Sequence, residues 1–546
     1  MLKRTIASWL LPALLLLTVA SGMHAQAATP AGHPNAGAAS GTPAPQASGT
    51  KGTAAQAAPA AKPQVLVAKG PRPEQFKFKP LVYDPPKGAD FRTQLANGLV
   101  VYIAEDHEIP WISASLMMRT GPFLEPKDKL GVAGMASTVM RTGGTKTMTG
   151  EQINERMDFL AGSVSATSLS IHKRYLDEGL NMWTDILRNP AFPEDKVRRE
   201  RDQALVNIRN RDKNLSQVAY RTYQKLLYGA DSPIAAEPTE EGTSGITRDD
   251  LAAWHKKYWG ANNAILVISG DFNKAEMLQK LEATFGKWTN AEKAVPPIPK
   301  VAQAAGAGVY MVQPDAPTNQ GVIQIGHIGL MMDDPDYPAV DLMNYVLGGG
   351  SFSSRITKVV RTDNGLAYST SSSFGGGLQY PGTFTAFCQT KDATVVFASQ
   401  LMLDLIEGMR AGDVKQADLD FARTARVEAF PATFGSMAQA LSAFASLEFY
   451  NRPRDYYDVW RAKYQKVTLA DIKRVAQKWL QTDKLVIMVA GNIDNCRKGA
   501  DKMLPNQPTI DAMAAKFGGR AIDGLAKKYG DGQVHIISLA KRATTN

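Results

Sequence analysis

Apolar and polar residues alternate with two different periods along the chain. Residues 99–104 form an apolar run with β-branched and aromatic side chains, residues 111–118 begin with Trp and Ile, and we expect each segment to form a β-strand. Residues 130–141 and 150–161 instead place apolar residues at helical spacing, which predicts two helices, the second with Thr149 as its N-cap. The pattern therefore predicts a fold in which strands and helices are mixed.

One helix–strand unit occurs twice in the chain. Residues 246–272 align without gaps to residues 467–493. In both copies a threonine, Thr247 or Thr468, stands where a helix N-cap belongs, and apolar residues follow at helical spacing. A short apolar strand and a glycine then end the unit. The repeat predicts that the chain holds two copies of one α/β domain.

A second pair of similar segments supports this duplication. Residues 101–103 and 309–311 read as equivalent strands near the start of each half. The stretch between the halves, residues 294–307, is rich in proline and alanine, which is typical of a joint between domains.

The N-terminal residues carry the pattern of an export signal. A basic start, an apolar run at residues 9–20 and Ala25-Gln-Ala27 predict a cleaved signal peptide over residues 1–27. The run is too short to span a bilayer, so we expect no stable membrane anchor. Residues 28–74 are mostly alanine, proline and glycine, which predicts a disordered linker. We therefore expect a secreted protein of a Gram-negative periplasm.

Composition narrows the classes of function. The chain has 546 residues, of which 44% are hydrophobic, enough to build more than one core. Its net charge of +10 arises from basic residues interspersed with acidic ones, so we expect no nucleic-acid partner. Its two cysteines, Cys388 and Cys496, exclude a disulfide scaffold and a cysteine zinc site. Whether these two cysteines pair with each other is open.

An ordered set of motifs resembles the pitrilysin/insulinase family of zinc peptidases, which includes the mitochondrial processing peptidase subunits. The motifs are Leu95-Ala-Asn-Gly-Leu-Val-Val-Tyr-Ile, Asn189-Pro-Ala-Phe-Pro, Tyr228-Gly-Ala-Asp-Ser-Pro, Gly348-Gly-Gly-Ser-Phe-Ser-Ser-Arg355 and Arg361-Thr-Asp-Asn-Gly-Leu-Ala-Tyr368. The similarity spans roughly residues 90 to 495.

The resemblance implies an α+β fold of two homologous domains. Each domain would be a mixed β-sheet covered by helices, and together they would form a half clam-shell. We expect the N-terminal peptidase-like domain at residues 75–295 and the C-terminal one at residues 305–495. Residues 496–546 would be a C-terminal extension, to which the sequence assigns no role.

The zinc site of the resembled family is degenerate in this chain. In that family His-x-x-Glu-His on the first helix supplies two zinc ligands and a general base, and a later glutamate is the third ligand. The matching positions here are Gly134, Ser137, Thr138 and Asn207, and no other His-x-x-Glu-His occurs. We therefore expect neither a metal nor a cofactor in this chain, and no catalytic residue that acts in this chain alone.

The Arg/Tyr pair that faces the zinc site in the resembled family is present here. Gly365 reads as a helix stop, which would place Arg361 on the last helical turn and Tyr368 at the start of a strand. The resemblance implies that Arg361 holds substrate carbonyls and that the Tyr368 hydroxyl donates to the oxyanion. The alternative is that Arg361 pairs with a local carboxylate such as Asp363 and that Tyr368 is a core aromatic.

These observations support two hypotheses. In the first, the chain is the non-zinc subunit of a two-chain metallopeptidase, and it binds peptide and supplies Arg361 and Tyr368 to the zinc site of a homologous partner in a heterodimer. In the second, it is an inactive structural or peptide-binding scaffold of the same fold. A third possibility, an active zinc peptidase, would require ligands that the sequence lacks.

Overall fold

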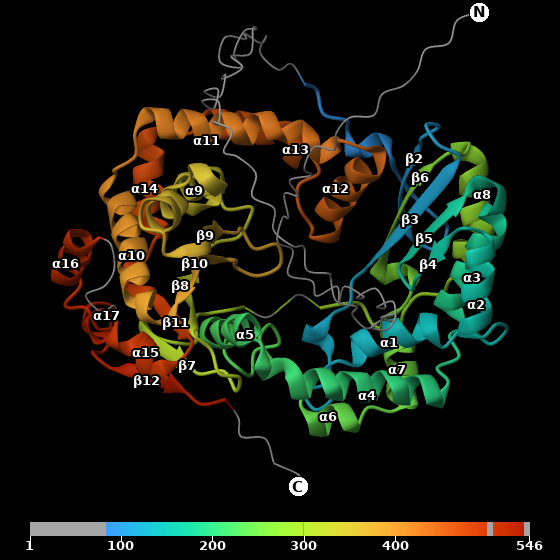
Figure 1. Ribbon diagram of the computed structural model, residues 1–546. Helices are drawn as coiled ribbons and strands as arrows, with labels where there is room; N and C mark the ends of the chain where they lie inside the picture. The colour runs from blue at the N-terminus through green and yellow to red at the C-terminus, as the bar shows by residue number, and fades with distance from the viewer. Residues whose placement is uncertain (1–82, 297, 299, 500–505, 540–546) are drawn as a thin grey trace, which may run out of the picture. The chain divides into compact units, whose positions relative to one another are not determined.

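The structure is a computed structural model that describes residues 83–296, 298, 300–499 and 506–539. The expected signal peptide and linker lie outside these residues. Within the described part of the chain, no helix is both long and apolar enough to cross a membrane. The described residues form two six-stranded sheets, each covered by helices (Figure 1).

The first sheet has the strand order β1-β2-β6-β3-β5-β4. Its strands are β1 (Arg92–Gln94), β2 (Val100–Glu105), β3 (Trp111–Met118), β4 (Ser163–Val164), β5 (Ser168–His172) and β6 (Ala264–Gly270). β2 and β6 are parallel, and the other pairs are antiparallel. Both strands expected near the start of the domain are confirmed.

The second sheet has the order β12-β7-β11-β8-β10-β9. Its strands are β7 (Gly308–Val312), β8 (Gln320–Ile328), β9 (Ala367–Phe374), β10 (Thr383–Lys391), β11 (Val486–Ala490) and β12 (Val534–Ile537). β11 is parallel to β7 and antiparallel to β8, as β6 is parallel to β2 and antiparallel to β3. The two sheets are mixed and share one topology over five strands, which confirms the predicted duplicated α+β fold.

The helices of the first half are α1 (Val132–Thr142), α2 (Gly150–Phe159), α3 (Leu176–Arg188), α4 (Glu194–Asn210), α5 (Leu215–Tyr228), α6 (Glu240–Ser244), α7 (Arg248–Tyr258) and α8 (Lys274–Thr284). Those that follow are α9 (Tyr337–Asn344), α10 (Val395–Ala411), α11 (Gln416–Ala429), α12 (Met437–Phe449), α13 (Tyr456–Gln465), α14 (Leu469–Trp479), α15 (Ile493–Lys498), α16 (Gln507–Lys516) and α17 (Asp523–Tyr529). The N-cap expected at Thr149 is confirmed, because it begins α2 with a capping box to Gln152.

The predicted repeat corresponds to α7 with β6 and to α14 with β11. Thr247 caps α7 in a capping box with Asp250, and Thr468 caps α14 in the same way with Asp471. Every residue of β6 and of β11 is buried, which explains why these strands read as continuous apolar runs.

Each sheet is covered on one face by a helix from the other half. Along β2, Val101 and Ile103 face the main core of the first half, whereas Tyr102 and Ala104 pack against α12. Along β11, Val486 and Met488 pack in the same way against α5. Figure 1 shows α12 beside β2 and β6, and α5 beside β11. This reciprocal exchange of helices joins the two halves.

A polar cluster at the end of α12 reinforces the exchange. The Glu448 carboxylate accepts hydrogen bonds from the Arg92 guanidinium at 2.7 and 2.8 Å and from the Tyr102 hydroxyl at 2.8 Å. Arg119 donates to the Glu448 backbone carbonyl at 3.1 Å. The charge of Glu448 is therefore paired where α12 meets the first sheet.

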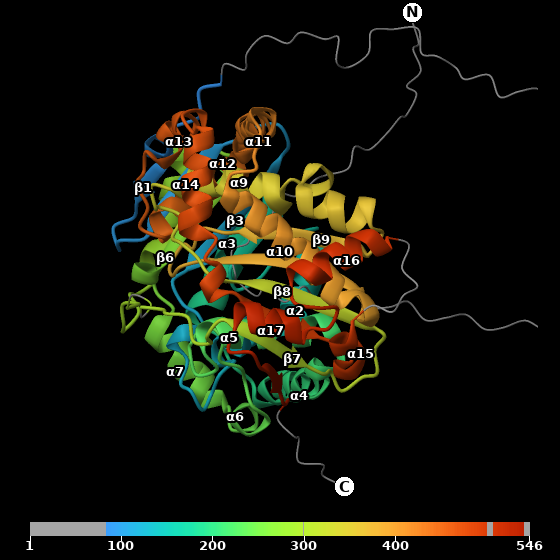
Figure 2. The ribbon, with the colours of Figure 1, turned by 90° about the vertical axis from the view of Figure 1, so that its left-hand side faces the viewer.

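The C-terminal residues complete the second half. α16 and α17 pack on its core through residues such as Phe517 and Leu525, and β12 pairs in parallel with β7. Figure 2 shows α10, α16 and α17 in front of the second sheet. β12 thus occupies, beside β7, the place that β1 occupies beside β2 in the first sheet.

Candidate functional site

Helix α1 carries three of the positions that match the zinc motif. Its buried face consists of Val132, Met135, Ala136, Val139 and Met140. Gly134 is exposed, and Ser137 and Thr138 are half-buried, so the three lie away from that apolar face. The Thr138 hydroxyl donates to the Gly134 carbonyl at 3.1 Å, a bond within the helix.

The residues on this face do not fit zinc. Zinc in proteins is bound by cysteine, histidine and carboxylate side chains. Gly134 has no side chain, and Ser137 and Thr138 offer only neutral hydroxyls. Asn207, on α4, is exposed, and its side-chain oxygen accepts a hydrogen bond from Gln203 at 3.1 Å. In the described part of the chain, no group of three or more His, Cys, Asp or Glu residues could hold a metal ion.

Arg361 and Tyr368 flank a sharp helix-to-strand junction. Arg361 lies in a π-helical turn, Thr357–Asp363, and Tyr368 is the second residue of β9. Between them Gly365 has φ of +62°, the left-handed conformation that stops the helix at low steric cost. The predicted helix stop is therefore confirmed.

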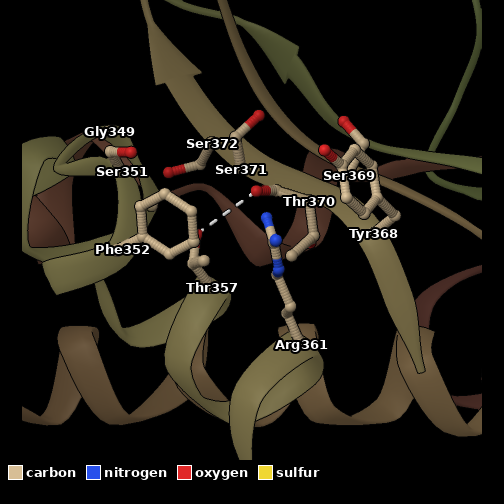
Figure 3. Close-up of a pocket in the computed structure, with 11 residues that line it drawn as sticks. Gly349, Ser351, Phe352, Thr357, Arg361, Tyr368, Ser369, Thr370, Ser371 and Ser372 are labelled. Carbon is tan, nitrogen blue, oxygen red and sulfur yellow. Dashed lines mark hydrogen bonds between the residues drawn. The ribbon is translucent and has the colours of Figure 1, made fainter. Parts of the chain in front are cut away.

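Both side chains line one pocket of about 330 Å³, here named the Arg361 pocket (Figure 3). Its lining residues are Gly348, Gly349, Ser351, Phe352, Thr357, Arg361, Tyr368, Ser369, Thr370, Ser371 and Ser372. The helix-to-strand junction therefore brings Arg361 and Tyr368 to one pocket.

The Arg361 guanidinium lies between two aromatic rings. Its central carbon is 4.7 Å from the centre of the Phe352 ring and 4.7 Å from that of the Tyr368 ring (Figure 3). Tyr368 is 85% exposed, so the alternative that made it a core aromatic is wrong. Within the described residues Arg361 forms no ion pair, so the alternative that paired it with Asp363 is wrong as well.

Hydroxyl groups form the floor of the pocket. Thr357 donates to the Thr370 carbonyl at 3.3 Å, and Ser372 donates to Asn344 at 2.7 Å, so these two side chains hold the wall of β9 in place. By contrast, the hydroxyls of Ser351, Ser369 and Ser371 make no hydrogen bond with any described residue, and all three residues are exposed.

The glycine-rich turn before the pocket permits close packing on β9. A Cβ on Gly348 would lie 2.3 Å from the backbone nitrogen of Ser372, closer than atoms can approach. Ser351 has φ of +53°, which is unusual for a residue other than glycine. Gly348 and Gly349 line the pocket, whereas the glycines at residues 375–377 do not.

Sequence reasoning missed Phe352 and the serines of β9. Phe352 is 67% exposed, and an exposed phenylalanine beside a glycine run is a detectable signal. The exposed positions of β9 are Tyr368, Ser369, Ser371 and Ser373, and such a run of small polar residues also marks a surface strand.

The two cysteines do not pair with each other. Cys388 and Cys496 are both free and buried. Burial raises the pKa of the Cys388 thiol to about 12, and the Cys496 thiol donates to Asp392 at 3.6 Å. Both thiols are therefore protonated and inert at neutral pH.

Comparisons with known proteins agree with the fold, and the relatives include proteins named as zinc proteases and one named as a non-peptidase. Residues 100–231 match the family described as insulinase (peptidase family M16), and residues 245–426 match the peptidase M16 inactive domain. A protein of Helicobacter pylori called non-peptidase homolog YmxG is 22% identical, and the match covers 72% of this chain and 91% of that protein. The zinc protease PqqE of the same bacterium is also 22% identical, over 71% of this chain and 89% of its own length.

A solved structure shows the same fold. The peptidase M16 inactive domain from Pseudomonas fluorescens aligns with a TM-score of 0.65 at 24% identity, covering 76% of this chain and 99% of that one. The first family match lies within the first half, whereas the second begins before α7 of the first half and extends into α11 of the second. The chain belongs to the insulinase family, peptidase family M16.

Proposed function

We propose that this chain is a non-peptidase member of its family that binds peptides in the Arg361 pocket without cutting them. One observation carries the proposal: the α1 face lacks every zinc donor, whereas the Arg361 pocket is open and lined with unused hydrogen-bonding groups. A relative that spans most of the chain is named a non-peptidase homologue, which also supports it.

The chemistry of the pocket suits an extended peptide. The Arg361 guanidinium and the free hydroxyls of Ser369 and Ser371 can bind peptide carbonyls, and the exposed rings of Phe352 and Tyr368 can cover an apolar side chain. A ligand pocket commonly combines apolar walls with a few polar groups in this way.

Peptide binding and peptide cleavage by the isolated chain test the proposal. A fluorescently labelled pool of casein peptides should bind, and Arg361→Ala should weaken binding by about tenfold or more, because a charged hydrogen-bond donor is lost. The control is Lys358→Gln, which removes one charge from an exposed residue of the same π-helical turn outside the pocket. Cleavage by the isolated chain, or one bound zinc per chain, would contradict the proposal.

A second candidate function is that of the non-zinc subunit in a two-chain metallopeptidase. The Tyr368 hydroxyl is on a side chain that is 85% exposed, so a group presented by another chain can reach it. Helicobacter pylori has both a non-peptidase homologue and a zinc protease that resemble this chain, which is consistent with paired subunits. Zinc would then belong to the homologous partner.

Reconstitution with a zinc-bearing homologue from the same genome tests this candidate. If Tyr368 donates to the oxyanion, Tyr368→Phe should lower kcat by about 100-fold with KM nearly unchanged, because the ring is kept and only the hydroxyl is removed. Lys358→Gln should leave kcat unchanged. Equal activity of the Tyr368→Phe pair and the unaltered pair would favour a scaffold role instead.

We also propose that the chain acts in the periplasm, on the basis of the signal-like residues 1–27. Fractionation of the cells that produce it, followed by N-terminal sequencing of the mature chain, tests this. A cytoplasmic chain that keeps residues 1–27 would contradict it.

A further inference from the structure

We propose that the Arg361 pocket is specific for a carboxylate, so that the peptides bound best are those that present a free C-terminus or an acidic side chain. This inference rests on the proposed peptide-binding function and narrows its ligand class. It concerns one charged group, Arg361, and the hydroxyls around it.

The charge balance of the pocket favours an anion. Arg361 is the only charged residue among the described residues that line it, and none of them is acidic. Neighbouring arginines are neutralised: Arg355 pairs with Asp418 at 2.9 Å, and Arg426 pairs with Asp341 at 2.6 Å. A guanidinium without an anionic partner, at the wall of a pocket, leaves a full positive charge available to a ligand.

The two rings fix the direction in which Arg361 can bind. Phe352 and Tyr368 lie on either side of the guanidinium, each ring centre 4.7 Å from its central carbon, so the rings restrict the directions from which a ligand can reach its hydrogen-bond donors. Figure 3 shows the guanidinium pointing between the rings toward the serines of β9. An arginine edge forms two parallel hydrogen bonds with a carboxylate, a geometry that a single carbonyl oxygen cannot reproduce.

The surrounding groups add further donors. The free hydroxyls of Ser351, Ser369 and Ser371 can donate to the carboxylate oxygens. A cationic ligand is disfavoured because Arg361 already occupies the space between the rings. At about 330 Å³ the pocket lies at the small end of ligand sites, which suits one terminal residue or one acidic side chain of a peptide.

Three labelled peptides of one neutral sequence distinguish the possible outcomes. The first has a free C-terminal carboxylate, the second ends in an amide, and the third ends in an amide but contains one aspartate. Each carries the same N-terminal rhodamine, and fluorescence anisotropy measures its affinity for the purified chain. We expect the peptide with the free carboxylate to bind about tenfold more tightly than the peptide that ends in an amide. One additional charge-assisted hydrogen bond accounts for an affinity ratio of that size.

The variants assign this preference to Arg361. Arg361→Gln should abolish the difference between carboxylate and amide, and Lys358→Gln should preserve it. If the third peptide matches the first, a side-chain carboxylate also serves as the ligand, whereas a match to the second restricts the site to C-termini.

Two outcomes would overturn the inference in different ways. Equal affinities for all three peptides would leave peptide binding intact and refute the carboxylate preference. Binding of none of them, nor of the casein pool, would refute the proposed function itself and the inference with it.

Discussion

The two sheets share the order of five strands, but the helix that carries the zinc-motif positions in the first half differs from the helical segment that carries Arg361 in the second. In the first half α1 is a regular α-helix whose outer face carries Gly134, Ser137 and Thr138. In the second half the helix α9 runs into a π-helical turn, Tyr345–Gly349, and a second π-helical turn carries Arg361. The zinc-motif positions of the first half thus carry no zinc donor, whereas the second half has a pocket around Arg361.

The difference shows that packing and chemistry occupy separate faces of the same helix. The apolar face of α1 holds the helix against the sheet through Met135, Ala136 and Val139, whichever residues stand on the outer face. The packing of α1 therefore does not depend on zinc donors on its outer face. In the second half, by contrast, Gly348 and Ser372 both build the pocket and pack the strand, so substitutions there affect both properties.

The largest expected effect concerns the exchanged helices. Leu441 in α12 and Leu227 in α5 are fully buried, so Leu441→Ala and Leu227→Ala should each lower the free energy of unfolding by about 2–5 kcal/mol. Because each helix packs on the other half, either variant should shift one common transition, followed by circular dichroism and by tryptophan fluorescence. Leucine-to-methionine variants are the controls, with a cost below about 1.5 kcal/mol. Two separate transitions, only one of them shifted, would show that the halves unfold independently.

A matched pair of glycines compares the two halves directly. A Cβ on Gly348 would meet backbone at 2.3 Å, so Gly348→Ala should cost about 1–3 kcal/mol and weaken peptide binding. A Cβ on Gly134 would meet nothing within 4 Å, so Gly134→Ala should stabilise α1 by up to about 1 kcal/mol. Thermal unfolding and peptide anisotropy measure both variants. Equal effects would contradict the distinction between the two faces.

The pH dependence of the free energy of unfolding tests the role of Asp336, the residue just before α9. Burial alone would raise the pKa of the Asp336 carboxyl. Hydrogen bonds from Lys478, Trp479 and Arg474 to the ionised carboxylate have the larger effect, and the pKa falls to about 2. The ionised form is therefore stabilising above about pH 4, and this stability is lost as the pH falls toward 2.

Asp336→Asn should accordingly lower the free energy of unfolding by about 1–2 kcal/mol at pH 7. Solvent around the half-exposed Arg474 and Lys478 keeps the effect this small. Below pH 4 the effect of the substitution should become progressively smaller. Urea unfolding at pH 7, 4 and 3 measures it. The control is Asp363→Asn, at an exposed carboxylate outside the pocket lining. A penalty that does not change between pH 7 and pH 3 would rule out this origin.

The smallest effect is expected at the positions that match zinc ligands. Ser137→Ala and Asn207→Ala, singly or together, should change the free energy of unfolding by less than about 0.5 kcal/mol, because both side chains lie on the outer faces of α1 and α4. Peptide affinity should also stay the same. A clear loss of binding in either variant would mean that the first half takes part in ligand recognition.

Local patterns in the sequence were sufficient to predict the repeated elements. The threonine N-caps of α7 and α14, the apolar strands β6 and β11, and the stop at Gly365 depend on near neighbours in the chain, and each is present in the structure. The missing zinc donors are likewise a property of residue type. For the pocket, the order Arg361, Gly365, Tyr368 predicted the helix-to-strand junction. It did not predict that Phe352 also contacts the Arg361 guanidinium.

Other features arise only when distant segments pack together. The sequence of an amphipathic helix shows which of its faces is apolar but not on which sheet that face packs. The exchange of α5 and α12 therefore depends on the tertiary packing of each helix against the sheet of the other half. β12 pairs with β7 for the same reason, although its residues lie outside the family resemblance.

The Arg361 pocket combines both kinds of information. The sequence by itself determined that this chain has an arginine and a tyrosine across a helix stop, and no zinc donor at the positions that match the family motif. Only the tertiary structure decided that the centre of the Phe352 ring lies 4.7 Å from the Arg361 guanidinium carbon, and that no carboxylate neutralises this charge among the described residues. Residue types set which groups can ionise or bind, whereas their burial, stacking and partners depend on contacts between segments that only folding brings together.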